Sequence, residues 1–256
     1  MQPSDPPSAP ARRAVPRPPH HRAGSEAPWA GLPAGDRRSI TLDRVLGAVG
    51  ASRAGPPTDA DRRGPWRSLA GTVVEGEPAA VLVALFEEDG ETRVILTVRS
   101  DRLRSHQGEV AFPGGRLDDG EGVVAGALRE AFEEVGLDPR LVAVVGELTP
   151  MPTRASNTVM TPVVATLDAR PGLVPNPGEV ERVFDVALSE LAADGVFHEE
   201  WWAAPGRPAS AGFPEGEFPV WFFELAGETV WGATARTLVE LICPVLGVPA
   251  PPSLRW

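Results

Sequence analysis

The pattern of apolar and polar positions becomes regular near residue 79, and it predicts a β-hairpin there. Residues 79–86 form the apolar run AAVLVALF, the polar segment EEDGE follows, and a second apolar segment, RVILTVR, occupies residues 93–99. A strand, a turn and a strand in this order are typical of a hairpin. We therefore expect the folded core to begin near Ala79.

Further strands are predicted along the rest of the chain, where short apolar runs are bounded by turn residues. The expected strands lie at residues 109–112, 141–148, 159–167 and 183–187, and residues 218–232 are expected to form a last hairpin. The strand that begins at residue 183 is expected to run into a helical turn that ends near residue 192. The region 197–220 has the irregular pattern of a loop.

Helices are predicted where apolar residues recur at helical spacing. The first begins after Thr41, a suitable N-cap, and places Leu42, Val45, Leu46 and Val49 on one face. A second helix spans residues 121–135 and ends at Gly136, and a third covers residues 233–247. Strands with interspersed helices predict an α/β (α+β) fold, in which helices sandwich a mixed sheet.

The first 37 residues are expected to be a disordered extension. They are dense in proline, alanine and glycine, carry scattered arginines, and show almost no apolar periodicity. Such a segment cannot bury enough apolar surface to form a core. We therefore expect the folded domain to comprise residues 38–256.

Composition narrows the class of protein. The formal net charge is −11, which argues against nucleic acid as a partner, and no apolar run approaches the roughly eighteen residues of a membrane helix. All 24 fixed side-chain cations are arginines, so any anion site must use guanidinium groups and backbone amides. The single cysteine, Cys243, suits a reducing compartment. We expect a cytoplasmic protein that acts on a small molecule, and a homodimer is a candidate assembly.

Negative charge is concentrated in the segment REAFEEVG, residues 129–136. Glu130, Glu133 and Glu134 are spaced at i, i+3 and i+4, so their side chains emerge from one helix face, and Arg129 alone cannot neutralise them. Each exposed pair of like charges costs about 0.2–0.5 kcal/mol. One interpretation is a solvated acidic face, and the other is a site for Mg²⁺ or Mn²⁺, which prefer oxygen ligands.

The longer segment GRLDDGEGVVAGALREAFEEVGL, residues 115–137, favours the metal site because it resembles the Nudix box. The matching positions are Gly115, Glu121, Arg129, Glu130, Glu133, Glu134, Gly136 and Leu137. Ala131 departs from the pattern, which asks for a larger aliphatic residue there. The segment also follows a predicted strand and a glycine loop, as the family requires.

The resemblance implies an α/β/α sandwich and a metal-dependent diphosphate hydrolase. It implies Glu130 and Glu134 as metal ligands, Glu133 as a further ligand or the general base, and Arg129 as the residue that orients a glutamate. Glu121 is a weaker candidate for an outer position. The general base varies within the family and is left open between Glu133 and residues outside the box.

The upstream segment ILTVRSDRLRSHQGEVAFPGG, residues 95–115, is similar to the signature of the coenzyme A diphosphatase subfamily. The matching residues are Leu96, Thr97, Arg99, Ser100, Arg104, Gly108, Phe112, Pro113, Gly114 and Gly115, with Ile95 in place of a leucine. The resemblance favours substrate binding by Arg99, Arg104, Gly108 and Gly114, since guanidinium groups suit phosphates. The role of Arg102 is left open, His106 is a lesser candidate for a substrate contact, and pairing of the arginines with Asp101 or Glu109 is the structural alternative.

Glycines at 114 and 115 permit a tight turn whose backbone can approach a phosphate or offer a carbonyl oxygen to the metal. The resemblance thus implies hydrolysis of coenzyme A or its thioesters to 3′,5′-ADP and (acyl-)4′-phosphopantetheine with Mg²⁺ or Mn²⁺. Hydrolysis of ADP-ribose, NADH or another nucleoside diphosphate derivative is an alternative. A non-catalytic ligand sensor with the same fold is another, although such sensors usually lose box glutamates that this chain retains.

Overall fold

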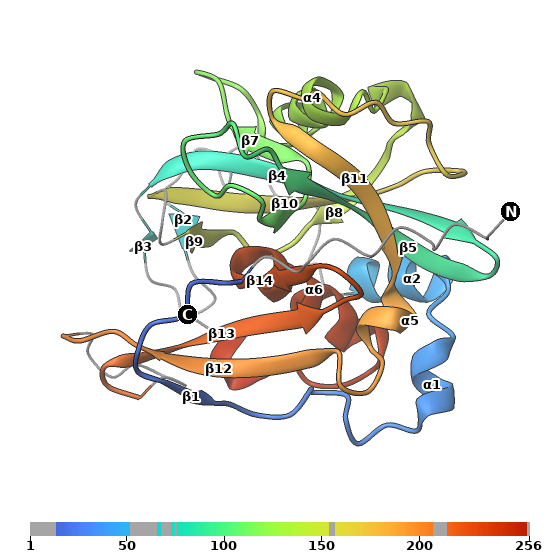
Figure 1. Cartoon of the computed structure of the whole chain (residues 1–256). Coiled ribbons are helices and arrows are strands. Elements are labelled where there is room, and N and C mark those ends of the chain that lie inside the picture. The colour runs from blue at the N-terminus through green and yellow to red at the C-terminus, as the bar shows by residue number, and fades with distance from the viewer. Residues whose placement is uncertain are drawn as a thin grey trace, which may run out of the picture.

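The computed structural model describes residues 14–51, 66–67, 73–74, 76–153, 157–206 and 214–254. Its largest element is an eight-stranded mixed sheet (Figure 1). The order along the sheet is β11 (Val180–Ala187), β5 (Glu91–Arg99), β4 (Glu77–Glu88), β10 (Thr158–Thr166) and β8 (Ala143–Glu147). Strand β4 runs parallel to β10 and antiparallel to β5, so the sheet is mixed as predicted.

Three short strands extend this sheet beside its central members. They are β6 (Val110–Ala111) on β5, β7 (Gly114–Arg116) on β4, and β9 (Met151–Thr153) on β10. The predicted strand at 109–112 is therefore present as β6, and the glycine turn after it is itself a strand. Because β7 pairs with the first half of β4, the glycines lie at the middle of the sheet.

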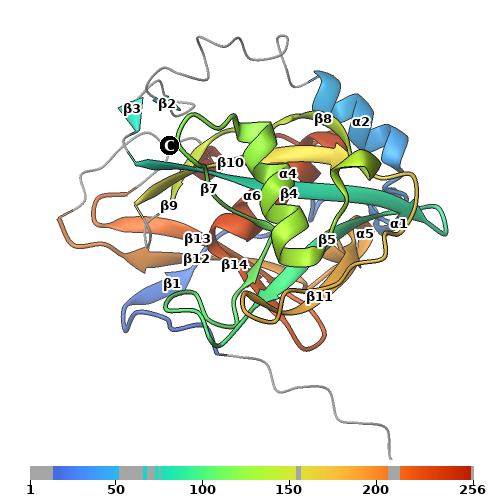
Figure 2. The same cartoon turned by 90° about the horizontal axis from the view of Figure 1, so that it is seen from above.

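Helices cover both faces of the eight-stranded sheet, which confirms the predicted layers. Helix α4 (Val123–Val135) lies on one face and crosses over the sheet in Figure 2. Helices α2 (Leu42–Ala51) and α6 (Gly232–Val245) lie on the other face (Figure 1). Side chains of β4 alternate between the two layers: Leu82 packs with the α4 core, and Val83 packs with the core that includes α2 and α6.

A second sheet lies beyond α6 and has four strands. Its order is β1 (His21–Ala23), β12 (Phe197–Ala203), β13 (Glu217–Glu224) and β14 (Thr229–Trp231). The hairpin predicted at 218–232 is confirmed as β13 and β14. The loop expected for 197–220 is wrong for β12, whose seven residues all pair with β13.

The expected disorder through residue 37 is also wrong from residue 14 onward, whereas residues 1–13 lie outside the described residues. Trp29 is fully buried and packs between the rings of Phe197 and Phe223, at centroid distances of 5.5 and 6.3 Å. Arg37, in helix α1 (Ala34–Arg38), is buried and donates a hydrogen bond of 2.8 Å to the backbone oxygen of Ala192. Contacts with distant parts of the chain, which no local periodicity reveals, hold this segment.

The remaining elements are short. They are the strands β2 (Trp66–Arg67) and β3 (Val73–Val74), the 3₁₀ helices η1 (Pro139–Leu141) and η2 (Pro252–Leu254), and helix α5 (Leu188–Leu191), which is the helical turn predicted after β11. None of the helices in the described part of the chain has the length and apolar character that a bilayer crossing requires.

Candidate active site

The two glycines of β7 lie so close to strand β4 and helix α4 that neither position has room for a Cβ atom. A Cβ atom on Gly114 would overlap the backbone oxygen of Ala80. A Cβ atom on Gly115 would lie 2.5 Å from the carboxylate carbon of Glu130 and would displace that carboxylate. Glycine at 115 therefore allows the Glu130 side chain to lie directly over the strand.

Small residues end helix α4 and let it pack closely on the sheet. Gly136 takes a left-handed conformation with φ 67°, and the backbone N–H groups of Gly136 and Leu137 donate to the carbonyl oxygens of Phe132 and Ala131. Ala131 is completely buried in the layer between α4 and the sheet. The small size of the Ala131 side chain therefore concerns how the helix packs on the sheet, and it does not change the neighbouring glutamates.

Glu134 is the most deeply buried carboxylate of the motif, with 5% of the residue exposed. One carboxylate oxygen accepts a hydrogen bond of 3.1 Å from the backbone N–H of Gly114, and the other lies 3.8 Å from a guanidinium nitrogen of Arg99. Burial raises the pKa of Glu134 to about 7, against the opposing effects of Gly114 and Arg99. Ionised Glu134 is therefore an unfavourable state that a nearby cation would stabilise.

Arg129 forms hydrogen bonds to the other glutamates of the motif. Its Nε and Nη2 atoms donate to the two oxygens of Glu121 at 3.0 and 2.9 Å, which lowers the pKa of Glu121. Its Nη1 atom donates to Glu130 at 2.9 Å and to Glu133 at 3.0 Å. Burial nevertheless raises the pKa of Glu130. Glu121 thus serves as a bidentate partner that fixes the arginine beside Glu130 and Glu133.

A fifth carboxylate, Glu179, joins the cluster from outside the motif. Its charge contributes to the raised pKa values of both Glu130 and Glu134. Two hydrogen bonds between backbone groups hold its loop. The N–H of Asn176 donates to the backbone carbonyl oxygen of Glu134 at 2.8 Å, and the N–H of Ser100 donates to the backbone carbonyl oxygen of Glu179 at 2.8 Å. Sequence reasoning missed Glu179, because only the pairing of β11 with β5 brings it to the site.

The cluster fits a hard divalent cation by its chemistry. The donors are carboxylate oxygens, and burial has raised the pKa of two of the carboxylates, Glu130 and Glu134. In the described residues no group of three or more acidic, histidine or cysteine side chains has the arrangement of a formed metal site. Arg129 currently binds the carboxylates that would turn toward a metal, so the fit rests on the donor set and on the burial of Glu130 and Glu134.

The predicted substrate loop adjoins this cluster through Arg99. The backbone N–H of Arg99 donates to the carbonyl of Glu109 at 3.0 Å, and its carbonyl accepts from the N–H of Gly108 at 2.9 Å, while its guanidinium points to Glu134. The backbone of Gly108 has a φ of 63°, in the left-handed region that favours glycine. Glu109 pairs with the ring Nδ1 of His106 at 2.9 Å, which raises the pKa of His106.

Arg104 and Arg102 lie on the exposed side of the same loop. In the part of the chain that the structure describes, Arg104 forms no ion pair, so its guanidinium is available to an anion. Arg99 pairs with Glu134 of the cluster and not with Glu109, which differs from the structural alternative considered for the loop arginines. The geometry thus brings Arg99 and Gly114 next to Glu134, joins Gly108 to the backbone of Arg99, and leaves Arg104 at the outer edge.

Comparison with known proteins shows which family the chain resembles. The family model of the NUDIX domain matches residues 76–204. Nudix hydrolase 15, mitochondrial, of Arabidopsis thaliana is 42% identical over 60% of this chain and 52% of its own length. An uncharacterized Nudix hydrolase NudL of Photorhabdus laumondii is 35% identical over 64% of this chain and 82% of its own.

Peroxisomal coenzyme A diphosphatase NUDT7 of Mus musculus is 41% identical over 50% of this chain and 54% of its own length. The chain thus spans about half the length of the Arabidopsis and mouse relatives. Among solved structures, a Nudix hydrolase from M. smegmatis, RenU, aligns with 25% identity and a TM-score of 0.38, over 51% of this chain and 83% of its own.

The chain belongs to the Nudix family. Several of its relatives are Nudix hydrolases. Enzymes of this family generally use divalent metal ions such as Mg²⁺ and act on small molecules.

Proposed function

We propose that this enzyme hydrolyses the diphosphate of coenzyme A or its acyl thioesters, releasing 3′,5′-ADP and 4′-phosphopantetheine or its acyl form. The observation that carries the proposal is the position of Arg99. Its backbone supports the substrate loop at Gly108 and Glu109, and its guanidinium lies 3.8 Å from Glu134. The 41% identity to a mouse coenzyme A diphosphatase supports the same substrate.

Glu130 and Glu134 are the proposed ligands of Mg²⁺ or Mn²⁺, with Glu133 and the carbonyl of Gly115 as further ligands. When bound, such an ion polarises the P–O bonds and lowers the pKa of a water molecule. Arg129 orients Glu130 and Glu133 through its two hydrogen bonds from Nη1. Arg99, Arg104 and the backbone of Gly108 and Gly114 bind the phosphate groups of the substrate.

Hydrolysis also needs a base that removes a proton from the attacking water. Glu133 is one candidate, because its side chain is half exposed and lies beside Arg129. Glu179 is the other, because it shares the electrostatic environment of Glu130 and Glu134 without being part of the motif. Replacement of each by glutamine separates them: the base variant loses turnover while keeping its affinity for the metal.

Two other functions compete with this proposal. A diphosphatase for ADP-ribose or NADH would use the same glutamates, and a non-catalytic sensor would bind its ligand without turnover. A comparison of kcat/KM for coenzyme A and ADP-ribose, with Mg²⁺ and with Mn²⁺, separates all three. We expect a clear preference for coenzyme A, whereas a preference for ADP-ribose contradicts the proposed substrate. A cytoplasmic setting and a homodimeric state remain part of this proposal.

A further inference from the structure

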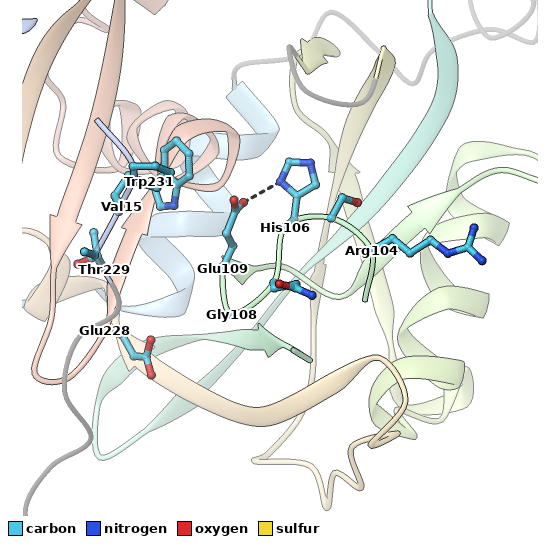
Figure 3. Close-up of a pocket in the computed structure, with 12 residues that line it drawn as sticks. Val15, Arg104, His106, Gly108, Glu109, Glu228, Thr229 and Trp231 are labelled. Carbon is cyan, nitrogen blue, oxygen red and sulfur yellow. Dashed lines mark hydrogen bonds and ion pairs between the residues drawn. The ribbon is translucent and has the colours of Figure 1, made fainter. Parts of the chain in front are cut away.

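A cavity of about 350 Å³ adjoins the substrate loop on the side away from α4 (Figure 3). Three separate segments line it: residues 104–109 of the loop, residues 228–231 near β14, and residues 14–16 of the N-terminal segment. The loop is fastened to Arg99 by the two backbone hydrogen bonds described above, and Arg99 reaches Glu134. The cavity therefore lies next to the proposed catalytic cluster, and Arg99 connects the loop that lines the cavity to Glu134 of the cluster.

The charges around this cavity disfavour a phosphate group inside it. Glu109 and Glu228 both line it, and each already has a cationic partner: Glu109 pairs with His106 and Glu228 with Arg182. Arg104 is the one arginine among the described residues of the lining, and in Figure 3 its guanidinium points away from Val15 and Trp231. With both carboxylates already paired and the Arg104 guanidinium turned away, an anion would find no free cation among these groups, whereas a neutral group would meet no unpaired charge.

The N-terminal wall of the cavity is held firmly in place. Val15 packs on the aromatic cluster of Trp202, Phe222 and Trp231 on the outer face of the second sheet. Next to it, Arg17 donates a hydrogen bond of 2.8 Å to Glu200, and its guanidinium lies 4.9 Å from the centre of the Phe222 ring. These contacts, with the pairing of β1 and β12 that follows, give the cavity a fixed apolar side.

We propose that this cavity receives the pantetheine arm of the substrate, and that residues 14–16 thereby determine specificity. This inference rests on the proposed function. The arm is neutral along its length and carries two amide groups between apolar segments, which matches the mixed lining. The adenosine half carries an additional phosphate on its ribose, for which the paired Glu109 and Glu228 leave no free cation in the cavity. That half lies instead toward Arg104, on the outer side of the loop.

The test uses the two reaction products as inhibitors, since each contains only one half of the substrate. Val15→Glu places a charge in the apolar wall, and we expect it to raise the inhibition constant of 4′-phosphopantetheine by about tenfold or more. The inhibition constant of 3′,5′-ADP should stay within about twofold of wild type. Val144→Glu, at an exposed position of the edge strand β8, is the matched control and should change neither constant.

Ala14→Trp is the second variant, because Ala14 is exposed and its replacement fills the cavity without altering the packing of Val15. Thermal melts show whether each variant is folded. If 3′,5′-ADP is the inhibitor that weakens, or if both weaken equally, the pantetheine arm does not occupy the cavity and the inference is wrong. A wild-type enzyme that cleaves ADP-ribose but not coenzyme A overturns the proposed function, and the inference with it.

Discussion

Replacing Glu134 with glutamine should abolish activity and yet stabilise the metal-free protein. Glutamine retains an oxygen that can accept the hydrogen bond from Gly114, but it cannot ionise. Burial raises the pKa of Glu134 to about 7 from the ordinary value of 4.5. At about 1.4 kcal/mol for each pH unit, ionising this buried group costs the folded state about 3 kcal/mol. The new amide nitrogen faces the Arg99 guanidinium, donor against donor, and this offsets part of the benefit, so we expect a gain of about 1–3 kcal/mol at about pH 8.

The pH dependence gives the direction of this effect. Folded wild-type protein holds the proton of Glu134 more tightly than the unfolded chain does. Its free energy of unfolding is therefore highest below about pH 4.5, and it falls as the pH rises through about 7. The free energy of unfolding of the variant should not fall in this way, so the two proteins should differ in stability at about pH 8 and converge near pH 4.5.

Urea unfolding without metal, at a series of pH values, measures the difference. Added Mg²⁺ should then raise the stability of the wild-type protein more than that of the variant, because binding to the folded state is linked to stability. Glu133→Gln is the control, since 52% of that side chain is exposed and its replacement should leave the pH profile of wild type. Parallel profiles for wild type and Glu134→Gln would refute the assignment of an unfavourable buried carboxylate.

Three further predictions follow from individual contacts. Gly115→Ala should reduce kcat by about a hundredfold with little loss of melting temperature, because its methyl group displaces Glu130, whereas Gly122→Ala has open space and should be active. Trp29→Ala should lower the free energy of unfolding in urea by about 3–5 kcal/mol, and an unchanged midpoint would contradict its burial. Arg104→Ala should raise KM for coenzyme A more than for dephospho-coenzyme A, and equal increases would place Arg104 away from the 3′-phosphate.

Local patterns in the sequence were sufficient for the elements around the site. The hairpin of β4 and β5 follows from two apolar runs and a polar turn, and α4 follows from its periodicity and the glycine at 136. Both kinds of signal act over a few residues, within one strand or one helix turn. The spacing of Glu130, Glu133 and Glu134 also defined a common helix face correctly.

Other features depend on contacts between distant residues, and their local sequence does not reveal them. Trp29 stands in a proline-rich stretch, and its burial depends on Phe197 and Phe223, far along the chain. Strand β12 contains the buried carboxylates Glu199 and Glu200, which hide its alternation of apolar and polar positions. Glu179 reaches the site only because β11 pairs with β5.

Identification of the products formed from coenzyme A tests the central claim most directly. The enzyme, with Mg²⁺ in isotopically labelled water, is incubated with coenzyme A, and the products are analysed by mass spectrometry. We expect 3′,5′-ADP and 4′-phosphopantetheine, one of which carries a single labelled oxygen. Intact coenzyme A under conditions in which ADP-ribose is cleaved to AMP and ribose 5-phosphate would contradict it.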